Sequence, residues 1–514
     1  MKSSFYRKKW NSLIRETPDQ GSIKRLSRQI AYSFLDFYLK DCRYEEEYID
    51  LLCEMATFSE DPKLTDPGTQ ALFGIIIESL CDDFEELQTL TYNRVMSQVI
   101  SYCRSLPDGV ELDQGLKNFG IYSSNDILDR INKIRANDNF LSPRGSVVKI
   151  LLLSRVTIGA DVAITSVIIE RFAEIFPKAE ILLIGDGKLK EIYGGNPRIK
   201  IRKVPYSRRG GLLGRLSSWL LVLKIIQQEK DSCRLGKTIL VDPDSRLSQL
   251  GVLPLISMND YFFFDSRSDA SLNSKMSMPE LANSWLNELT GEEGGYCYPS
   301  VWIPETYMGC ATQFCRGLKE NGARQIIVVN FGVGGNSRKR VGGRMEEKLL
   351  LTLLQEPDTV VLLDKGFGEE ELLNSNSLID AVEKQGYPAL HILFDSENNP
   401  LSDKGSVWGF AAKKTGGSII IGVQSGIGEI AALIANCDEF IGYDSACQHI
   451  AAALKLPCLT IFAGSNNMRF IRRWSAYGPE NCNIIHVDTL TDPASIDVDD
   501  IITRITNVRE SRKP

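Results

Sequence analysis

The stretch FIGYDSACQHIAAAL, residues 440–454, indicates the fold more directly than any other part of the chain. It begins as a short apolar run, turns at Asp444 and Ser445, and continues into an alanine-rich segment that carries His449. Small residues let a helix pack closely on a sheet, and ligand crevices of α/β proteins open at the carboxyl ends of strands. The stretch therefore predicts a parallel α/β sheet with a polar site at this turn.

Buried strands and single helices alternate along most of the chain. One run of strands begins at Val147 and a second at Gln325, separated by the irregular stretch GEEGGYCYPSVWIPE. Strands joined by single helices form parallel sheets through right-handed crossovers. We therefore predict an α/β protein with two Rossmann-type, doubly wound lobes facing each other across a cleft. The strand-like segments are VVKILLLS, EILLIGD, IKIRKV, TILVD and YFFFD, then QIIVVNFG, TVVLLD, ALHILFD, SIIIGV, EFIGYD, CLTIFAG and NIIHVD.

Residues 1–140 differ from the rest and predict a mainly helical extension. Segments such as SRQIAYSFLDFYLKDC carry apolar residues at helical spacing and few strand signals. We place the N-terminal lobe at 147–320, the C-terminal lobe at 324–490, and a closing helix with a tail at 491–514. A chain of 514 residues is too long for a single hydrophobic core, which agrees with a division into several domains. The sequence indicates no function for the extension.

The composition excludes several classes of protein. With 43% hydrophobic and 24% charged residues the chain is globular, and its net charge of -7 argues against a nucleic-acid partner. No apolar run approaches the roughly 18 residues that span a bilayer. Twelve cysteines without a C-x-x-C pair and only three histidines lead us to expect reduced thiols, no metal site and no cofactor. Because the N-terminus lacks the apolar core of a secretory signal, we expect a cytoplasmic location.

Two basic stretches raise the question of an anionic surface. The first 28 residues combine lysines and arginines with Phe5, Tyr6 and Trp10, and a second basic stretch lies at 198–215. Such segments can rest on an anionic membrane or attract a phosphorylated acceptor. A solvated basic face is the simpler interpretation. Peripheral contact with the cytoplasmic face of the inner membrane stays open as an alternative.

The first strand of the first lobe leads into SRVTIGADV, residues 154–162. Gly159 permits a tight turn, and Asp161 lies near the start of the following helix. A helix-capping aspartate is the simpler interpretation, worth about 1 kcal/mol. In the alternative, the carboxylate projects into the crevice as a general base. The local sequence alone favours the cap.

The second lobe opens with a strand, a glycine-rich loop and clustered cations, VNFGVGGNSRKR at 329–340. The loop matches neither a Walker A motif nor G-x-G-x-x-G. Glycines such as Gly332 and Gly334 still let backbone N–H groups approach an anion, and Lys339 with Arg340 can neutralise a diphosphate. A flexible surface turn is an equally good interpretation of this loop by itself.

Two further segments place polar residues at the same rim. VQSGIGEI brings Ser425, Gly426 and Glu429 to the start of a helix. There Glu429 either accepts hydrogen bonds from a sugar hydroxyl or stabilises the first helical turn through the helix dipole. A lone histidine such as His449 is more often a core residue, but its position about one turn after Asp444 directs both toward one crevice.

Asp242-Pro-Asp244 follows an apolar strand and allows two interpretations. A D-x-D pair can bind Mg²⁺ or Mn²⁺ with a sugar-nucleotide diphosphate, which would imply a single-lobe architecture. The alternative is a proline turn flanked by helix-capping residues. We prefer the turn, because this segment belongs to the first lobe and the phosphate-like loop to the second.

Taken together, these segments resemble glycosyltransferase family 9, the ADP-heptose:lipopolysaccharide heptosyltransferases, from about residue 147 to residue 486. GYDSACQHIAAALKLPCLTIFAG is similar to the family segment D-[ST]-G-x-x-H-x-A-A-A, with Ala446 in place of the usual glycine. SRVTIGADV is similar to the opening loop, with Ala160 inserted. GNSRKR is similar to the basic end of the donor phosphate loop, without the Trp-Pro that commonly follows, and DPDSRLSQL to the acceptor side.

The resemblance implies a GT-B arrangement in which the first lobe binds mainly the acceptor and the second the donor. It also implies inversion at the anomeric carbon without an essential metal, with Asp161 as the catalytic base. The implied acceptor-binding residues are Arg155, Asp244 and Arg246. The implied donor-binding residues are Gly332, Gly334, Lys339, Arg340, Ser425, Gly426, Glu429, Asp444, Ser445 and His449.

We therefore expect an inverting, metal-independent glycosyltransferase. It would move a heptose-like sugar from a nucleotide-diphosphate donor, similar to ADP-heptose, to a saccharide or lipid-linked saccharide, as in lipopolysaccharide core or related glycan synthesis. A sugar-nucleotide epimerase on the same fold is one alternative and would need no acceptor. A non-catalytic sugar-nucleotide sensor, with the helical extension as its interaction module, is another. Product analysis with the donor alone would identify an epimerase. Tight donor binding without turnover would identify a sensor.

Overall fold

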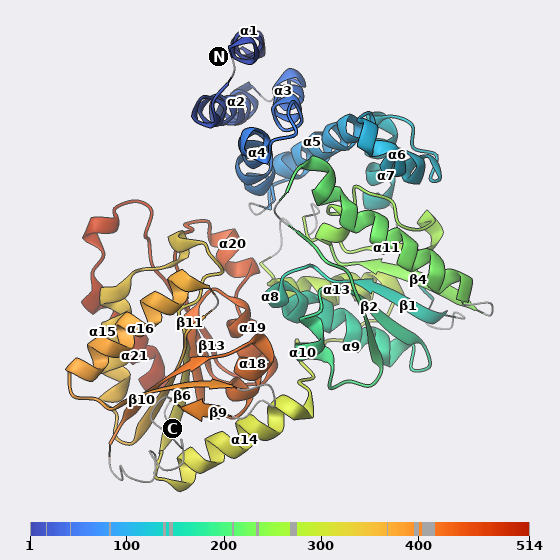
Figure 1. Cartoon of the computed structure of the whole chain (residues 1–514). Helices are drawn as coiled ribbons and strands as arrows, with labels where there is room; N and C mark the ends of the chain where they lie inside the picture. Colours follow the sequence, from blue (N-terminus) through green and yellow to red (C-terminus); the bar gives the residue numbers. More distant parts are fainter. Residues whose placement is uncertain are drawn as a thin grey trace.

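The computed structural model describes residues 2–16, 18–41, 43–81, 84–136, 140–142, 147–207, 210–232, 236–267, 275–366, 368–394, 400–402 and 417–512. An N-terminal helical region is followed by two α/β lobes (Figure 1). Each lobe holds a parallel or mostly parallel sheet covered by helices, so the predicted fold class is confirmed. Within these described ranges, no helix has the length and apolar character needed to cross a membrane.

The N-terminal region consists of helices, as its apolar spacing predicts. Its main helices are α1 (Ser3–Arg15), α2 (Gln20–Asp41), α3 (Glu47–Met55), α4 (Pro62–Gln70), the π-helix η1 (Ala71–Ile77), α5 (Glu86–Arg104), α6 (Val110–Lys117) and α7 (Ser124–Arg135). Helix α2 buries Ile23, Ile30 and Phe34 along one face. A capping box between Ser123 and Asp126 starts α7.

The first lobe is built on five strands: β1 (Val147–Leu153), β2 (Glu180–Gly185), β3 (Ile199–Lys203), β4 (Lys237–Asp242) and β5 (Tyr261–Phe263). They are all parallel, in the order β3-β2-β1-β4-β5. The central strand β1 is buried at every position except Val148. Its buried positions include Lys149, whose Nζ donates to Glu229 Oε2 at 2.7 Å. The winding direction reverses between β1 and β4, where a doubly wound sheet opens its ligand crevice.

Helices of the first lobe lie on both faces of this sheet. They are α8 (Ile158–Ala160), η3 (Asp161–Thr165) and α9 (Ser166–Ile175), which form one helical run, with α10 (Leu189–Tyr193), α11 (Leu212–Ser232) and α13 (Met278–Thr290). The sequence predicted the run through α9 but not the π-helical turn at its start.

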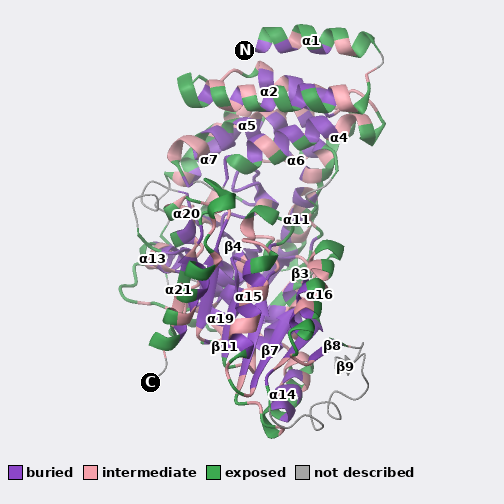
Figure 2. Cartoon of the chain, turned by 90° about the vertical axis from the view of Figure 1, so that its left-hand side faces the viewer, coloured by how far each residue is buried: buried purple, intermediate pink, exposed green. Residues whose placement is uncertain are grey.

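The helical region shares its apolar core with one face of the first sheet. The cluster that contains Trp10 also contains Leu151 of β1 and Leu182 of β2. Arg130 of α7 donates to the carbonyl of Gly251 at 2.8 Å. The helical region is therefore packed onto the first lobe. Figure 2 colours the chain by burial and shows buried residues, in purple, in both parts.

The second lobe holds β6 (Gln325–Asn330), β7 (Thr359–Asp364), β8 (Ala389–Phe394), β9 (Pro400–Ser402), β10 (Ile419–Gln424), β11 (Glu439–Tyr443), β12 (Cys458–Phe462) and β13 (Cys482–His486). Their order is β13-β12-β11-β6-β7-β10-β8-β9, and only the β8–β9 pair is antiparallel. The sequence predicted these strands apart from β9. Here the winding reverses at β6 and β11, and the carboxyl ends at such a reversal are where doubly wound sheets bind ligands.

Helices α15 (Gly343–Leu354), α16 (Glu369–Lys384) and α21 (Val498–Ser511) pack on one face of this sheet. The other face receives α14 (Glu305–Glu320), α18 (Ile427–Ala435) and α19 (Ala446–Ala453). A short helix, α20 (Met468–Arg473), follows β12. Helix α14, which joins the lobes in Figure 1, was not predicted, whereas the irregular stretch before it was. The predicted closing helix is confirmed as α21.

Candidate active site between the lobes

Asp161 lies where the first strand of the first lobe passes into its long helical run. Its side chain is 1% exposed. Oδ2 accepts a hydrogen bond from Ser154 Oγ at 2.7 Å, and Oδ1 accepts from Arg155 N at 2.7 Å and Thr165 Oγ1 at 2.8 Å. Because Asp161 lies inside a helical run that starts at Ile158, its interpretation as a helix cap is wrong. The carboxylate instead ties the loop after β1 to the helix.

Burial gives this carboxyl group the basicity that a general base needs. Burial raises the pKa of Asp161 to about 6, although hydrogen bonds from Ser154 and Arg155 act in the opposite direction. A carboxylate offers roughly four acceptor positions, and three donors among the described residues occupy it, one of them on Oδ2. One acceptor position of Oδ2 therefore has no donor among these residues. Single π-helical turns such as η3 are also frequent at functional sites.

The predicted acceptor-side residues come together at the carboxyl ends of β1 and β4. Arg155 Nη1 donates to the carbonyl of Pro243 at 2.6 Å and lies 3.9 Å from Asp244 Oδ2. Arg246 begins the short turn η4 (Arg246–Ser248), two residues after Asp244. The loops after β1 and β4 thus form one continuous polar wall of the first lobe.

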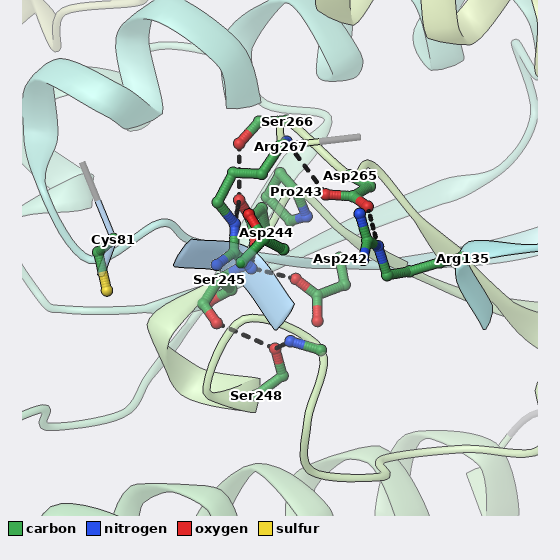
Figure 3. Close-up of polar contacts among 12 residues, drawn as sticks. Cys81, Arg135, Asp242, Pro243, Asp244, Ser245, Ser248, Asp265, Ser266 and Arg267 are labelled. Carbon is green, nitrogen blue, oxygen red and sulfur yellow. Dashed lines mark hydrogen bonds and ion pairs between the residues drawn. The ribbon is translucent and has the colours of Figure 1, made fainter. Parts of the chain in front are cut away.

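The two carboxylates of Asp242-Pro-Asp244 have different partners (Figure 3). Asp242 accepts from Tyr261 Oη at 2.6 Å and from Ser245 N at 2.7 Å, whereas Asp244 pairs with Arg267 Nη2 at 3.1 Å. Although burial acts to raise it, the pKa of Asp244 is held below its usual value by neighbouring guanidinium groups, first of all Arg267. Ser245 caps η4. This arrangement supports the interpretation as a structural turn.

In the second lobe, Lys339 and Asp444 meet at the carboxyl ends of β6 and β11. Lys339 Nζ lies 2.5 Å from Asp444 Oδ2, and Gln448 Nε2 donates to Oδ1 at 2.7 Å. Asp444 is buried, but the Lys339 side chain keeps 25% of its surface exposed. A partly exposed cation, oriented by a buried carboxylate, can contact the phosphate of a ligand.

The neighbouring Arg340 is engaged within the lobe. Its Nε donates to Glu346 Oε1 at 3.0 Å, and Tyr443 Oη donates to the same oxygen at 2.9 Å. Glu346 is fully buried, so this pair secures the start of α15. A cavity of about 470 Å³ opens beside it and is lined by Arg340, Gly342, Gly343 and residues of α16. Of the two predicted cations, Lys339 is the better placed for a ligand phosphate.

The glycine loop after β6 is open on one side and closed on the other. Gly334 and Gly335 have φ of 60° and 81°, and a Cβ at either would meet no atom within 4 Å. Gly332 lies against Glu371, whose Oε1 accepts from Val333 N at 3.0 Å. One backbone N–H of the loop is therefore already satisfied by a carboxylate.

The start of α18 is held by the opposite lobe. Gly426 is its N-cap residue, and Gly428 N donates to Glu191 Oε2 of the first lobe at 3.0 Å. Glu429 Oε2 is buried and has no hydrogen-bond partner among the described residues. Glu191 thus occupies part of the helix N-terminus that the sequence had suggested for a ligand, and it was not predicted.

A polar network that the sequence did not single out joins the remaining strand ends. Asn330 Nδ2 donates to Asp364 Oδ2 at 2.6 Å, and Ser445 Oγ donates to Asn330 Oδ1 at 3.2 Å. Ser425 Oγ lies 3.4 Å from Asp364 Oδ1. Burial raises the pKa of Asp364 to about 6. One sequence signal could have identified them. Asn330 and Asp364 are each the last residue of an apolar strand, just as Asp444 directly follows one.

His449 lies at the contact between the lobes. A Cβ at Gly159 would come within 3.2 Å of both Ala446 Cα and His449 Cδ2, so the close approach of these lobes depends on glycine. The ring of Trp474 lies 6.2 Å from that of His449 and 5.9 Å from the Arg155 guanidinium group. Residues around Asp161 and around Asp444 therefore line one junction.

Burial lowers the pKa of His449 to about 4, which predicts a pH-dependent contribution to stability. The unfolded chain binds this proton near pH 6.5. The folded protein should therefore lose stability as pH falls from about 7 to 4, by at most about 3 kcal/mol from this group. Burial raises the pKa values of three carboxyl groups, those of Asp161, Asp242 and Asp364. Their contributions to stability therefore increase as pH falls, opposite to that of His449.

The difference between the parent protein and His449→Gln isolates the histidine contribution. Urea unfolding at several pH values should show the variant gaining relative stability as the solution becomes acidic. A stability difference that does not change between pH 7 and 4.5 would contradict a buried, neutral His449.

Comparisons with known proteins bear on this arrangement. Residues 419–492 match the family model described as glycosyltransferase family 9 (heptosyltransferase). A glycosyltransferase of family 9 from Veillonella parvula has a similar fold, with a TM-score of 0.50 and 14% identity over 72% of this chain and 99% of that one. ADP-heptose lps heptosyltransferase II of E. coli is 13% identical over 71% and 100% of the two chains, with a TM-score of 0.44. No curated protein matches the chain.

The two α/β lobes, with a polar junction between them, form a fold of the GT-B type. The matched segment runs from β10 past β13 and contains Ser425, Glu429, Asp444, Ser445 and His449. This segment is therefore similar to glycosyltransferase family 9, the family whose resemblance the sequence indicated. Asp161 lies outside the matched segment, so its role depends on the geometry alone.

Proposed function

We propose that the protein is an inverting transferase that moves a heptose-like sugar from a nucleotide-diphosphate donor to a saccharide acceptor without requiring a metal. One observation carries the proposal. The contact of Gly159 with Ala446 and His449 brings the loop of Asp161 to the strand ends that hold Lys339 and Asp444. A base from one lobe and a cation from the other thus line the same junction.

The proposed reaction uses groups from both lobes. Asp161 removes the proton of the acceptor hydroxyl as that oxygen attacks the anomeric carbon of the donor. The bond between this carbon and the diphosphate oxygen breaks, and the configuration inverts. Lys339 stabilises the negative charge that develops on the departing diphosphate, a role that fixed charges perform well in a site shielded from water. Asp444 holds Lys339 in place.

A buried arginine on α20 of the second lobe favours a ligand that carries an anionic group. Arg473 is 1% exposed, and its Nε, Nη1 and Nη2 have no hydrogen-bond partner among the described residues. Its guanidinium group lies 6.0 Å from the ring of Phe84, next to Trp474 in the chain. Burial of an unpaired charge costs several kcal/mol. A carboxylate or phosphate on a bound ligand would remove this cost.

A thermal-shift screen with ADP-, GDP- and UDP-sugars tests the proposed donor class. A ligand at 100 times its Kd stabilises a protein by about 2.7 kcal/mol, so one nucleotide should raise the melting temperature more than the others. Absence of any shift at high concentration would contradict the proposal.

The same preparations distinguish the alternative activities. Conversion of the bound donor without acceptor would indicate an epimerase. Tight binding without transfer to acidic saccharides, including lipid-linked ones, would indicate a sensor.

A further inference from the structure

A basic cavity lies where the helical region meets the first lobe, and none of its described lining residues belongs to the candidate active site. Its volume is about 330 Å³. Lys24 and Arg28 of α2 line it, together with Phe73, Gly74 and Ile75 of η1 and Arg215 of α11. The two basic stretches that the sequence shows at opposite ends of this part of the chain therefore meet in one place. Arg208 and Arg209 of the second stretch lie outside the described residues.

The cavity combines positive charge with apolar surface. Among the described residues that line it, three are cations and one, Glu78, is a carboxylate. The Arg215 guanidinium group lies 4.4 Å from the ring centroid of Phe73, which places a charge directly above an apolar wall. Phe73 is buried and Ile75 is half-buried. Such a site suits a phosphate group joined to an apolar chain better than a free inorganic anion.

The rim of the cavity is open at Gly74. A Cβ at this position would meet no atom of the described residues within 4 Å. Gly74 belongs to the seven-residue π-helix η1, and its φ is not positive, so a side chain at this position is compatible with the backbone. A larger residue can therefore occupy the opening without changing any charge of the cavity.

Helix α2 continues the same chemistry along its exposed face. Lys24, Arg28, Tyr32 and Leu39 recur at helical spacing and lie within about 40° of Arg28 around the helix axis. Tyr32 is 50% exposed and Leu39 is 57% exposed. The Arg28 guanidinium group lies 6.0 Å from the Tyr32 ring. Cations next to exposed aromatic and aliphatic side chains are typical of helices that lie on a membrane surface.

We propose that this cavity binds the phosphate head group of an anionic phospholipid while the exposed face of α2 rests on the membrane. The acyl chain would contact Phe73 and Ile75, and the phosphate would contact Lys24, Arg28 and Arg215. The site would hold the transferase at a membrane surface. This inference does not depend on the proposed sugar transfer, because lipid binding requires no donor.

Sedimentation with vesicles tests the proposal on the full-length protein. Vesicles containing phosphatidylglycerol should bind the protein, and pure phosphatidylcholine vesicles should not. Each basic residue near such a surface contributes about 1 kcal/mol, so the double variant Lys24→Gln/Arg28→Gln should bind about 30-fold more weakly. The control Lys178→Gln/Lys384→Gln removes the same charge from two exposed lysines outside the cavity and should bind like the parent protein.

A steric variant separates the cavity from general attraction of charge. Gly74→Gln should weaken binding about tenfold without changing the net charge, whereas Gly309→Gln on α14, also in open surroundings, should have no effect. Equal binding by cavity and control variants would overturn the proposal. So would stabilisation by inorganic phosphate together with no vesicle binding, which would indicate a site for a soluble phosphate.

Discussion

Asp161→Asn should reduce the rate of sugar transfer by about 10²- to 10⁴-fold, the usual contribution of a general base. The substituted amide has nearly the same shape, but it cannot take a proton from the acceptor. Donor affinity should change little, because Asp161 belongs to the lobe that faces the acceptor. Steady-state transfer rates and donor binding, measured on the same preparation, check both expectations.

Asp242→Asn is the matched control for this substitution. Asp242 is as deeply buried as Asp161, ends strand β4 of the same sheet, and also has a pKa raised by burial to about 6. Because the proposed reaction gives Asp242 no part, its variant should retain transfer activity. Similar losses in both variants, or full activity of Asp161→Asn with an intact fold, would exclude Asp161 as the base.

The pH dependence of the parent enzyme provides a second readout of the same role. Since a base must be ionised, kcat/KM should fall tenfold per pH unit below about pH 6 and level off above it. The residual kcat/KM of Asp161→Asn should not show this decrease at low pH.

Lys339→Gln should weaken donor binding by about 10- to 100-fold, the range for one hydrogen bond to a charged group. Glutamine can still donate to Asp444, so the substitution removes the positive charge with little loss of local structure. The turnover number should also fall, because the departing diphosphate loses a stabilising charge. Calorimetric titration with the nucleotide-sugar that emerges from the thermal-shift screen measures the effect.

Arg338→Gln serves as the control for the cation. Arg338 is the exposed neighbour of Lys339 and carries the same charge. If both variants bind the donor equally weakly, the effect reflects the general field of the loop rather than contact with Lys339. If neither variant weakens donor binding, the second lobe binds the diphosphate elsewhere.

The sequence was most informative where structure depends on local pattern. Continuous apolar runs such as VVKILLL and TVVLLD predicted buried parallel strands, and the polar residues that follow them predicted where the crevice opens. Lys339 and Asp444 were each predicted from their own segments. Their contact across 105 positions was not, because it follows from the order of β6 and β11 in the sheet.

Contacts between distant segments account for what the sequence did not predict. Nothing local marks Glu191 as the partner of an α18 backbone group in the other lobe, or Glu371 as the partner of Val333. The aspartate at 161 resembles a helix cap by its neighbours, yet it bonds Ser154 on the preceding strand-end loop. The shared core of the helical region and the first sheet depends on the same kind of long-range packing.

The most direct measurement is a crystal structure of the protein with a bound nucleotide-diphosphate sugar. We expect the diphosphate within hydrogen-bond distance of Lys339 Nζ, and the anomeric carbon facing Oδ2 of Asp161 across the junction between the lobes. A diphosphate bound away from Lys339, or a sugar directed away from the first lobe, would contradict the proposed reaction.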